Sequence, residues 1–185
     1  MIYFIRHGLD DESYIGGWSN ISLTDTGRKQ IKDSANWIKE NLNIKEIISS
    51  DILRARESAL IIASILNIDV TYLEPLREQN KGIYNGLERK KLKQVDKTFI
   101  KNVQVDTIYP DGESLKDLYR RISKLICELN VLEDDTLIVT HRGVINMIYY
   151  NSLDIPLDMD KGRFLVTHGS VHEYDKSKKM IRRIY

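Results

Sequence analysis

Patterns typical of strands and of helices alternate along this chain, and the alternation limits its possible folds more than any other feature. Short apolar runs predict strands at Ile2–Ile5, Glu46–Ser49, Asp69–Leu73 and Thr136–Thr140. Between them, helical spacing of apolar residues predicts helices over Thr24–Leu42, Asp51–Leu66 and Glu113–Leu132, and another helix soon after His141. Strands separated by helices indicate βαβ units. We therefore expect an α/β fold of three αβα layers, in which a mostly parallel, doubly wound sheet carries helices on both faces.

Two segments depart from this alternation of strands and helices. Residues 163–185 are typical of a β-hairpin with a polar turn at Asp175–Lys179, which predicts an antiparallel edge to the sheet. The stretch from Glu78 to Gly112 is long, polar and rich in turn residues. We interpret residues 79–112 as an excursion, or lid, over the active site, so that residues 1–185 form a single domain.

The composition excludes several classes of partner. Lysine and arginine number 28 and aspartate and glutamate 27, a net charge of +1, so we expect neither nucleic acid nor an anionic membrane as a partner. The basic run Arg89–Lys93 is interpreted as a solvated helix face. The N-terminus lacks a signal-peptide pattern and no apolar run has membrane-spanning length, which predicts a cytoplasmic protein. Cys127 is the only cysteine, which excludes an internal disulfide, and we expect its thiol to be buried.

Three predicted strands end in unusual residues. The first ends in Arg6-His7-Gly8, the second runs into a helix whose first turn contains Arg54, and Thr136–Thr140 ends in His141-Arg142-Gly143. Carboxyl ends of neighbouring parallel strands meet at one crevice, where helix N-termini and arginines favour phosphate. Each residue alone is more often structural, but the repeated placement predicts an anion site. His168 and His172 lie in the predicted hairpin and are interpreted as structural, and Ser50 or Asp51 is expected to cap the second helix.

Six segments together resemble the histidine phosphatase superfamily, the phosphoglycerate-mutase-like proteins. In chain order they are FIRHG, LTDTGRKQ, SSDILRARESA, LREQNKG, DGES and VTHRG. The resemblance implies that His7 is the nucleophile and becomes phosphorylated, and that Arg6, Arg54 and His141, the last preferably as a cation, hold the phosphoryl oxygens. It also implies that Glu78 donates a proton to the leaving group and then activates water, which requires a raised pKa in the complex. Neither a metal nor a cofactor is needed for this chemistry.

The chain also departs from the pattern of the family it resembles. Leu9 and Asp10 follow Gly8 where Glu and Thr are common, Ser13 replaces an asparagine, Ser58 replaces a threonine, and Arg142 replaces a glycine. We keep Gly8, Ser13 and Arg142 as candidate phosphate or substrate contacts.

The expected function is hydrolysis of a small phosphorylated metabolite through a phosphohistidine at His7. One alternative is phosphoryl transfer of the phosphoglycerate mutase type, and another is a non-catalytic phospho-ligand-binding relative. A metal hydrolase is less favoured, because the histidines form no compact ligand motif.

Overall fold

The computed structural model describes residues 1–95, 97–129, 133–160 and 162–185. Its centre is a six-stranded sheet in the order β3-β2-β4-β1-β5-β6. The strands are β1 (Ile2–Arg6), β2 (Glu46–Ser49), β3 (Val70–Tyr72), β4 (Thr136–Thr140), β5 (Val171–Asp175) and β6 (Met180–Arg183). The strands from β3 to β1 pair in parallel, whereas β5 pairs antiparallel with both β1 and β6. The predicted α/β fold, with its parallel sheet and C-terminal antiparallel edge, is confirmed.

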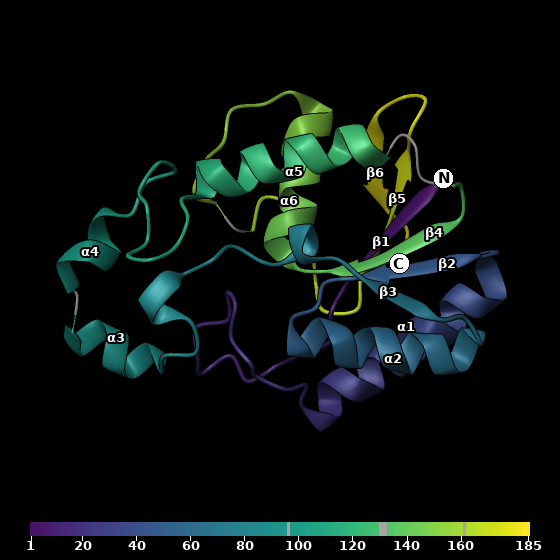
Figure 1. Ribbon diagram of the computed structural model, residues 1–185, viewed down its shortest axis with the longest axis horizontal. Coiled ribbons are helices and arrows are strands. Elements are labelled where there is room, and N and C mark those ends of the chain that lie inside the picture. Colours follow the sequence, from purple (N-terminus) through teal and green to yellow (C-terminus); the bar gives the residue numbers. More distant parts are fainter. Residues whose placement is uncertain (96, 130–132, 161) are drawn as a thin grey trace.

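Helices cover both faces of the sheet (Figure 1). One face carries α1 (Asp25–Asn41) and α2 (Leu53–Leu66), and the other carries α5 (Leu115–Leu129) and α6 (Arg142–Leu153). The central strand β1 shows why: Ile2 and Phe4 enter the apolar cluster of α5 and α6, while Tyr3 and Ile5 enter that of α1 and α2. Successive side chains of a strand point to opposite faces, so a strand buried on both faces is an unbroken apolar run.

The segment between β3 and α5 forms short helices beside the sheet. They are η1 (Glu74–Leu76), η2 (Gly82–Tyr84), α3 (Arg89–Val95) and α4 (Lys97–Asn102). In Figure 1, α3 and α4 stand away from the three layers. The rings of Tyr84, Phe99 and Tyr109 contact one another, with centroids 5.4 to 6.1 Å apart, and give this segment an aromatic cluster of its own. Its proposed action as a lid stays a prediction.

The helix caps agree with expectation in α1 and differ in α2. Thr24 caps α1, its hydroxyl accepting a hydrogen bond from the Gly27 N–H at 3.0 Å. In α2 the N-cap is Ile52, which makes no side-chain cap, so the prediction of Ser50 or Asp51 was wrong. Both of those side chains have other partners: Ser50 contacts His141, and Asp51 binds Arg77.

Cys127 is exposed on α5, which corrects the expectation of a buried thiol. Leu118, Ile122 and Ile126 form the buried stripe of this helix. At 100° per residue, position 127 lies about half a turn from the centre of that stripe and therefore faces outward. In the described part of the chain, no helix is both long and apolar enough to cross a membrane.

Candidate active site

The two histidines predicted at strand ends face each other. His7 follows β1 and His141 follows β4, and these strands are parallel neighbours, so both side chains leave the same edge of the sheet. Their ring centroids are 5.1 Å apart, with planes at 60°. The His7 N–H donates to the Thr140 carbonyl at 2.9 Å, which fixes the two strand ends relative to each other. The predicted convergence at the carboxyl edge of the sheet is present in the structure.

His7 is held by one hydrogen bond at each ring nitrogen. Its Nδ1 lies 2.7 Å from the carbonyl oxygen of Gly8 and donates to it, so the lone pair is on Nε2. Arg54 Nε donates to that Nε2 at 3.1 Å. Burial, followed by the positive charges of Arg54, His141 and Arg6, holds the pKa of His7 well below its usual value. The imidazole is therefore neutral, which is the form that can act as a nucleophile.

Two glycines fix the loop that follows His7. A Cβ added at Gly8 would lie 2.9 Å from Ile31 and closer still to the Gly27 carbonyl, and one added at Gly27 would clash with the Leu9 backbone. The first turn of α1 therefore packs directly onto the loop. The Gly8 N–H donates to Ser58 Oγ at 3.2 Å. Gly8 thus acts through close backbone packing and through its carbonyl on His7.

Two arginines flank His7. Arg54, in the first turn of α2, is 2 % exposed and donates from Nη2 to the Gly17 carbonyl at 2.8 Å. Arg6, the last residue of β1, donates from Nη1 to the Val166 carbonyl at 2.9 Å. The Arg6 Nε is buried and has no hydrogen-bond partner in the described part of the chain. A buried donor without a partner is costly, so this N–H is available to an anionic ligand.

His141 is neutral rather than cationic in this ligand-free structure. Its Nε2 lies 2.9 Å from Ser50 Oγ, and its buried Nδ1 has no partner among the described residues. Burial, and after it the charges of Arg54, Arg6 and Arg121, holds its pKa well below the usual value. The surrounding guanidinium groups oppose a further positive charge, and the cation expected when a phosphoryl group is bound stays a prediction.

The side-chain carboxylate of Glu78 lies against the N-terminus of α6. Its carboxylate accepts from the Gly143 N–H at 3.1 Å and from the Gln79 N–H at 2.9 Å. Burial acts to raise its pKa, but those two N–H groups and the charge of Arg54 outweigh burial and hold the pKa below its usual value. A helix N-terminus stabilises the carboxylate form, and the raised pKa expected in the complex with substrate stays a prediction.

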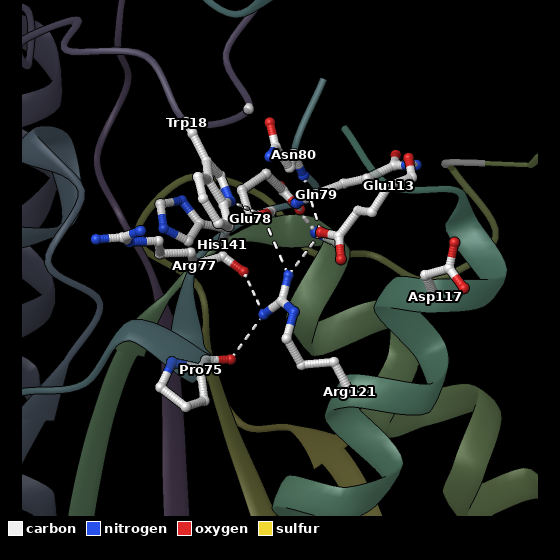
Figure 2. Close-up of polar contacts among 12 residues, drawn as sticks. Trp18, Pro75, Arg77, Glu78, Gln79, Asn80, Glu113, Asp117, Arg121 and His141 are labelled. Atoms are coloured by element: carbon white, nitrogen blue, oxygen red, sulfur yellow. Dashed lines mark hydrogen bonds and ion pairs between the residues drawn. The ribbon is translucent and has the colours of Figure 1, made fainter. Parts of the chain in front are cut away.

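Arg121 on α5 fixes the segment that carries Glu78 (Figure 2). Its Nη1 donates to the carbonyls of Pro75 and Arg77, at 2.7 and 3.0 Å, and its Nη2 donates to the carbonyl of Glu78 at 3.3 Å. Trp18 Nε1 donates to that same Glu78 carbonyl from the opposite segment, at 2.7 Å. The backbone of Glu78 is therefore held from two sides, while its carboxylate points to α6.

A cavity of about 350 Å³ opens in front of His7. Its walls include Arg6, Arg54 and Glu78, together with Arg142 and residues of the 79–112 segment. Arg142 lines the cavity, and its role as a substrate contact stays a prediction. Ser13 is exposed and is not part of the cavity wall, and its N–H donates to Asp11 instead. Of the predicted residues, Ser13 alone is not brought to the site.

His168 belongs to the site, contrary to the structural interpretation from sequence. Its ring centroid lies 5.6 Å from that of His7, and its Nε2 lies 2.6 Å from Arg6 Nη2. Burial, and after it the charges of Arg6, Arg142 and Arg54, lowers the pKa of His168 to about 3, so Nε2 accepts the hydrogen bond as a neutral imidazole. His172, by contrast, is fully buried between Tyr149 and Ser170, which agrees with a structural role.

Potential ligand atoms of His7, Asp10 and His168 lie within 4.8 Å of one another, a separation that a metal ion could bridge. The charges around them favour an anion instead. Arg54 donates to His7 Nε2 and Arg6 to His168 Nε2, so the lone pairs that would bind a cation already face two guanidinium groups. Asp10 is the single carboxylate in this set of three.

Comparison with known proteins agrees with this geometry. The sequence pattern of the histidine phosphatase superfamily (branch 1) matches residues 2–185. The probable phosphoglycerate mutase GpmB of Escherichia coli is 31 % identical over 163 residues, which cover 84 % of this chain and 75 % of that protein.

Solved structures share the fold at lower identity. A putative α-ribazole-5'-P phosphatase from Escherichia coli K-12 superposes with a TM-score of 0.83 at 20 % identity, over 99 % of this chain and 93 % of that one. A mycobacterial glucosyl-3-phosphoglycerate phosphatase superposes with a TM-score of 0.77 at 21 % identity, over 99 % and 95 % of the two chains. With the family pattern spanning residues 2–185, this chain belongs to the histidine phosphatase superfamily, branch 1.

Proposed function

We propose that this protein is a metal-independent phosphomonoesterase that hydrolyses a small phosphorylated metabolite through a phosphohistidine at His7. The observation that carries the proposal is the state of His7: a neutral ring whose Nδ1 is bound to the Gly8 carbonyl and whose Nε2 faces Arg54 at 3.1 Å. A cavity of about 350 Å³ suits a small ligand. Its walls combine the arginines with aromatic residues of the 79–112 segment, which we propose as a lid.

The chemistry proceeds in two displacements at phosphorus. In the first, the Nε2 lone pair of His7 forms the N–P bond while the P–O bond to the leaving group breaks, and the leaving oxygen takes a proton from Glu78. The positive charge that develops on the ring is stabilised by the Gly8 carbonyl at Nδ1. In the second, water gives a proton to the Glu78 carboxylate and attacks phospho-His7, which restores the neutral ring and releases phosphate.

The surrounding groups have separate tasks in both steps. Arg6, Arg54 and His141 bind the equatorial phosphoryl oxygens, whose charge grows in the transition state. The phosphoryl dianion brings negative charge next to His141 and Glu78, and so raises the pKa of both from the low values of the free site. Binding of the substrate thereby favours the protonated forms of His141 and Glu78.

The test is hydrolysis of p-nitrophenyl phosphate in the presence of a chelator. We expect activity in the wild type, loss of at least about 1,000-fold in His7→Asn, and a labelled phosphohistidine after rapid quenching with 32P-labelled substrate. His172→Gln is the matched control, because it changes a buried histidine that binds Tyr149 and Ser170 instead. Full activity of His7→Asn, or dependence of activity on added metal, would contradict the proposal.

Phosphoryl transfer of the mutase type is the second candidate, favoured by the 31 % identity to a probable phosphoglycerate mutase. Incubation with 3-phosphoglycerate separates the two activities. We expect release of inorganic phosphate, whereas a mutase would form the 2-phospho isomer without it. Tight phosphate binding without turnover of any ester would instead indicate a non-catalytic relative.

A further inference from the structure

Asp10 places a carboxylate inside a site built for anions. It is 9 % exposed, lines the cavity, and holds Oδ2 3.4 Å from Arg54 Nε. The same Arg54 Nε lies 3.1 Å from His7 Nε2, the atom that must reach phosphorus. Asp10 also has a carboxylate oxygen within 4.8 Å of ligand nitrogens of His7 and His168. A phosphoryl group in contact with His7 therefore lies in contact range of Asp10.

Two negative groups at that distance repel each other strongly in a buried site. A phosphoryl dianion and an ionised Asp10 would also compete for the same Arg54 N–H. The conflict is removed if one proton lies between the carboxyl group and a phosphoryl oxygen, since repulsion then becomes a charge-assisted O–H···O hydrogen bond.

The backbone around Asp10 gives the side chain little freedom to withdraw. The Leu9 N–H donates to Gln30 Oε1 at 3.0 Å, and the Leu9 carbonyl accepts from the N–H and the hydroxyl of Thr24, at 2.9 and 3.0 Å. Asp10 itself forms a β-bridge to Leu23. Gly27, in the first turn of α1, packs directly against the Leu9 backbone, so α1 holds this loop in place.

We propose that Asp10 is a phosphoryl-binding residue, which contacts the substrate as a neutral carboxylic acid and donates an O–H hydrogen bond to a phosphoryl oxygen. This inference rests on the proposed phosphoryl site at His7. Binding of a dianionic substrate therefore places one solvent proton at Asp10, in addition to those taken up at His141 and Glu78, and a monoanionic substrate brings the Asp10 proton itself. The substrate class that follows is a phosphate monoester whose phosphoryl group shares one proton with Asp10.

The titratable and charged groups that face Asp10 come from four parts of the fold. They are Arg54 of α2, Arg6 and His7 at the end of β1, His168 before β5, and Glu12 of the same loop. Burial raises the pKa of Asp10 above its usual value, although the charges of Arg54 and Arg6 act against burial. A bound phosphoryl dianion offsets those two cations, and so removes the main influence that keeps Asp10 ionised.

The experiment measures the affinity of inorganic phosphate for the intact protein by calorimetry, between about pH 5 and pH 8, in buffers of different ionisation enthalpy. At pH 8 we expect Asp10→Asn to bind phosphate about tenfold more tightly than the wild type, because the amide donates without a proton from solvent. At pH 5 the two affinities should converge. Phosphate binding by the wild type at pH 8 should take up about one proton more than binding by Asp10→Asn. Asp10→Thr, with a neutral hydroxyl, should behave like Asp10→Asn.

Asp11→Asn is the matched control, since it removes the same charge from an exposed neighbour on the same loop and should leave phosphate binding within about twofold of the wild type. Weaker binding by Asp10→Asn at every pH would overturn the inference and make Asp10 an anchor for Arg54. Equal proton uptake by the two proteins, or phosphate binding by neither, would overturn it as well. The measurement needs no turnover, so a protein that shows this pattern but hydrolyses no ester would refute the proposed function alone.

Discussion

Replacing Gly143 by alanine should disable proton donation by Glu78 while leaving the fold intact. A Cβ at position 143 would lie 2.0 Å from Glu78 Oε1, where real Cβ atoms keep at least 3.0 Å. The carboxylate must therefore retreat by about 1 Å, which breaks its hydrogen bond to the Gly143 N–H. The added methyl meets Leu118 at 3.2 Å, which needs only a small adjustment.

The expected effects on stability and activity differ in size. Loss of a hydrogen bond to a charged group costs about 1.5–3 kcal/mol, and alanine offsets up to about 1 kcal/mol of this through its helix propensity. The net cost of about 0.5–2 kcal/mol leaves a typical domain folded. A displacement of about 1 Å in a catalytic group costs roughly 100-fold in rate.

The assay compares two leaving groups. p-Nitrophenolate leaves without a proton, whereas phenolate is a poorer leaving group and gains more from an acid. For Gly143→Ala we expect kcat/KM to fall roughly 100-fold on phenyl phosphate and less than about tenfold on p-nitrophenyl phosphate. Glu78→Gln should show the same selectivity. Gly162→Ala is the control, because a Cβ there meets its nearest atom at an ordinary 3.4 Å.

Equal losses on the two substrates would refute the reasoning, because they would show that the change acts on phosphate binding rather than on the leaving group. Unchanged hydrolysis of phenyl phosphate by Gly143→Ala would refute it as well, since the carboxylate would then not act from its place at α6.

Three further outcomes are expected. His168→Leu should raise KM for phosphate esters about tenfold and His168→Gln much less, because glutamine keeps a neutral acceptor for Arg6; equal effects of the two changes would contradict this role. His172, with a folded pKa of about 4 against 6.5, binds its proton more weakly when folded, so stability is lost as pH falls from 6.5 towards 4. Urea titrations of His172→Gln should show a pH slope lower by about 1.4 kcal/mol per unit in that range, and an unchanged slope would contradict the assignment. Finally, His7 should contribute no acidic limb to kcat/KM near pH 6.5, because its pKa lies well below that value. A limb there that does not move with the second pKa of the phosphate ester, compared over several esters, would show that His7 titrates normally.

The sequence could predict those features of the fold and of the site that depend on a local pattern of residues. The run Ile2–Ile5 is apolar at every position, which predicts a strand buried on both faces, and β1 is such a strand. Because parallel strands present their carboxyl ends at one edge, the positions of His7, Arg54 and His141 after strands were enough to predict that they meet. The exposure of Cys127 also follows from the helical period of α5, which places this residue opposite the apolar stripe.

The place of His168 and the protonation states of Glu78 and His141 depend instead on packing between segments that are far apart in the sequence. His168 reaches Arg6 because β5 pairs antiparallel with β1, which brings the Gly169 N–H to the Arg6 carbonyl and the Ser170 carbonyl to the Arg6 N–H. No spacing in the sequence indicates that pairing. The protonation states of Glu78 and His141 are equally non-local, because each depends on charges and N–H groups from several elements.

The proposed catalytic residues and the cavity-lining residues of the 79–112 segment lie in different parts of the chain. This separation affects how such a protein can evolve. The residues proposed for catalysis lie at the edge of the central sheet, whereas Leu92, Phe99 and Tyr109 reach the cavity from the 79–112 segment, which has its own small aromatic cluster. We expect substitutions in the 79–112 segment to alter which substrate the cavity accepts without disturbing the proposed catalytic residues. Chemistry and selectivity can therefore evolve at different speeds within one chain.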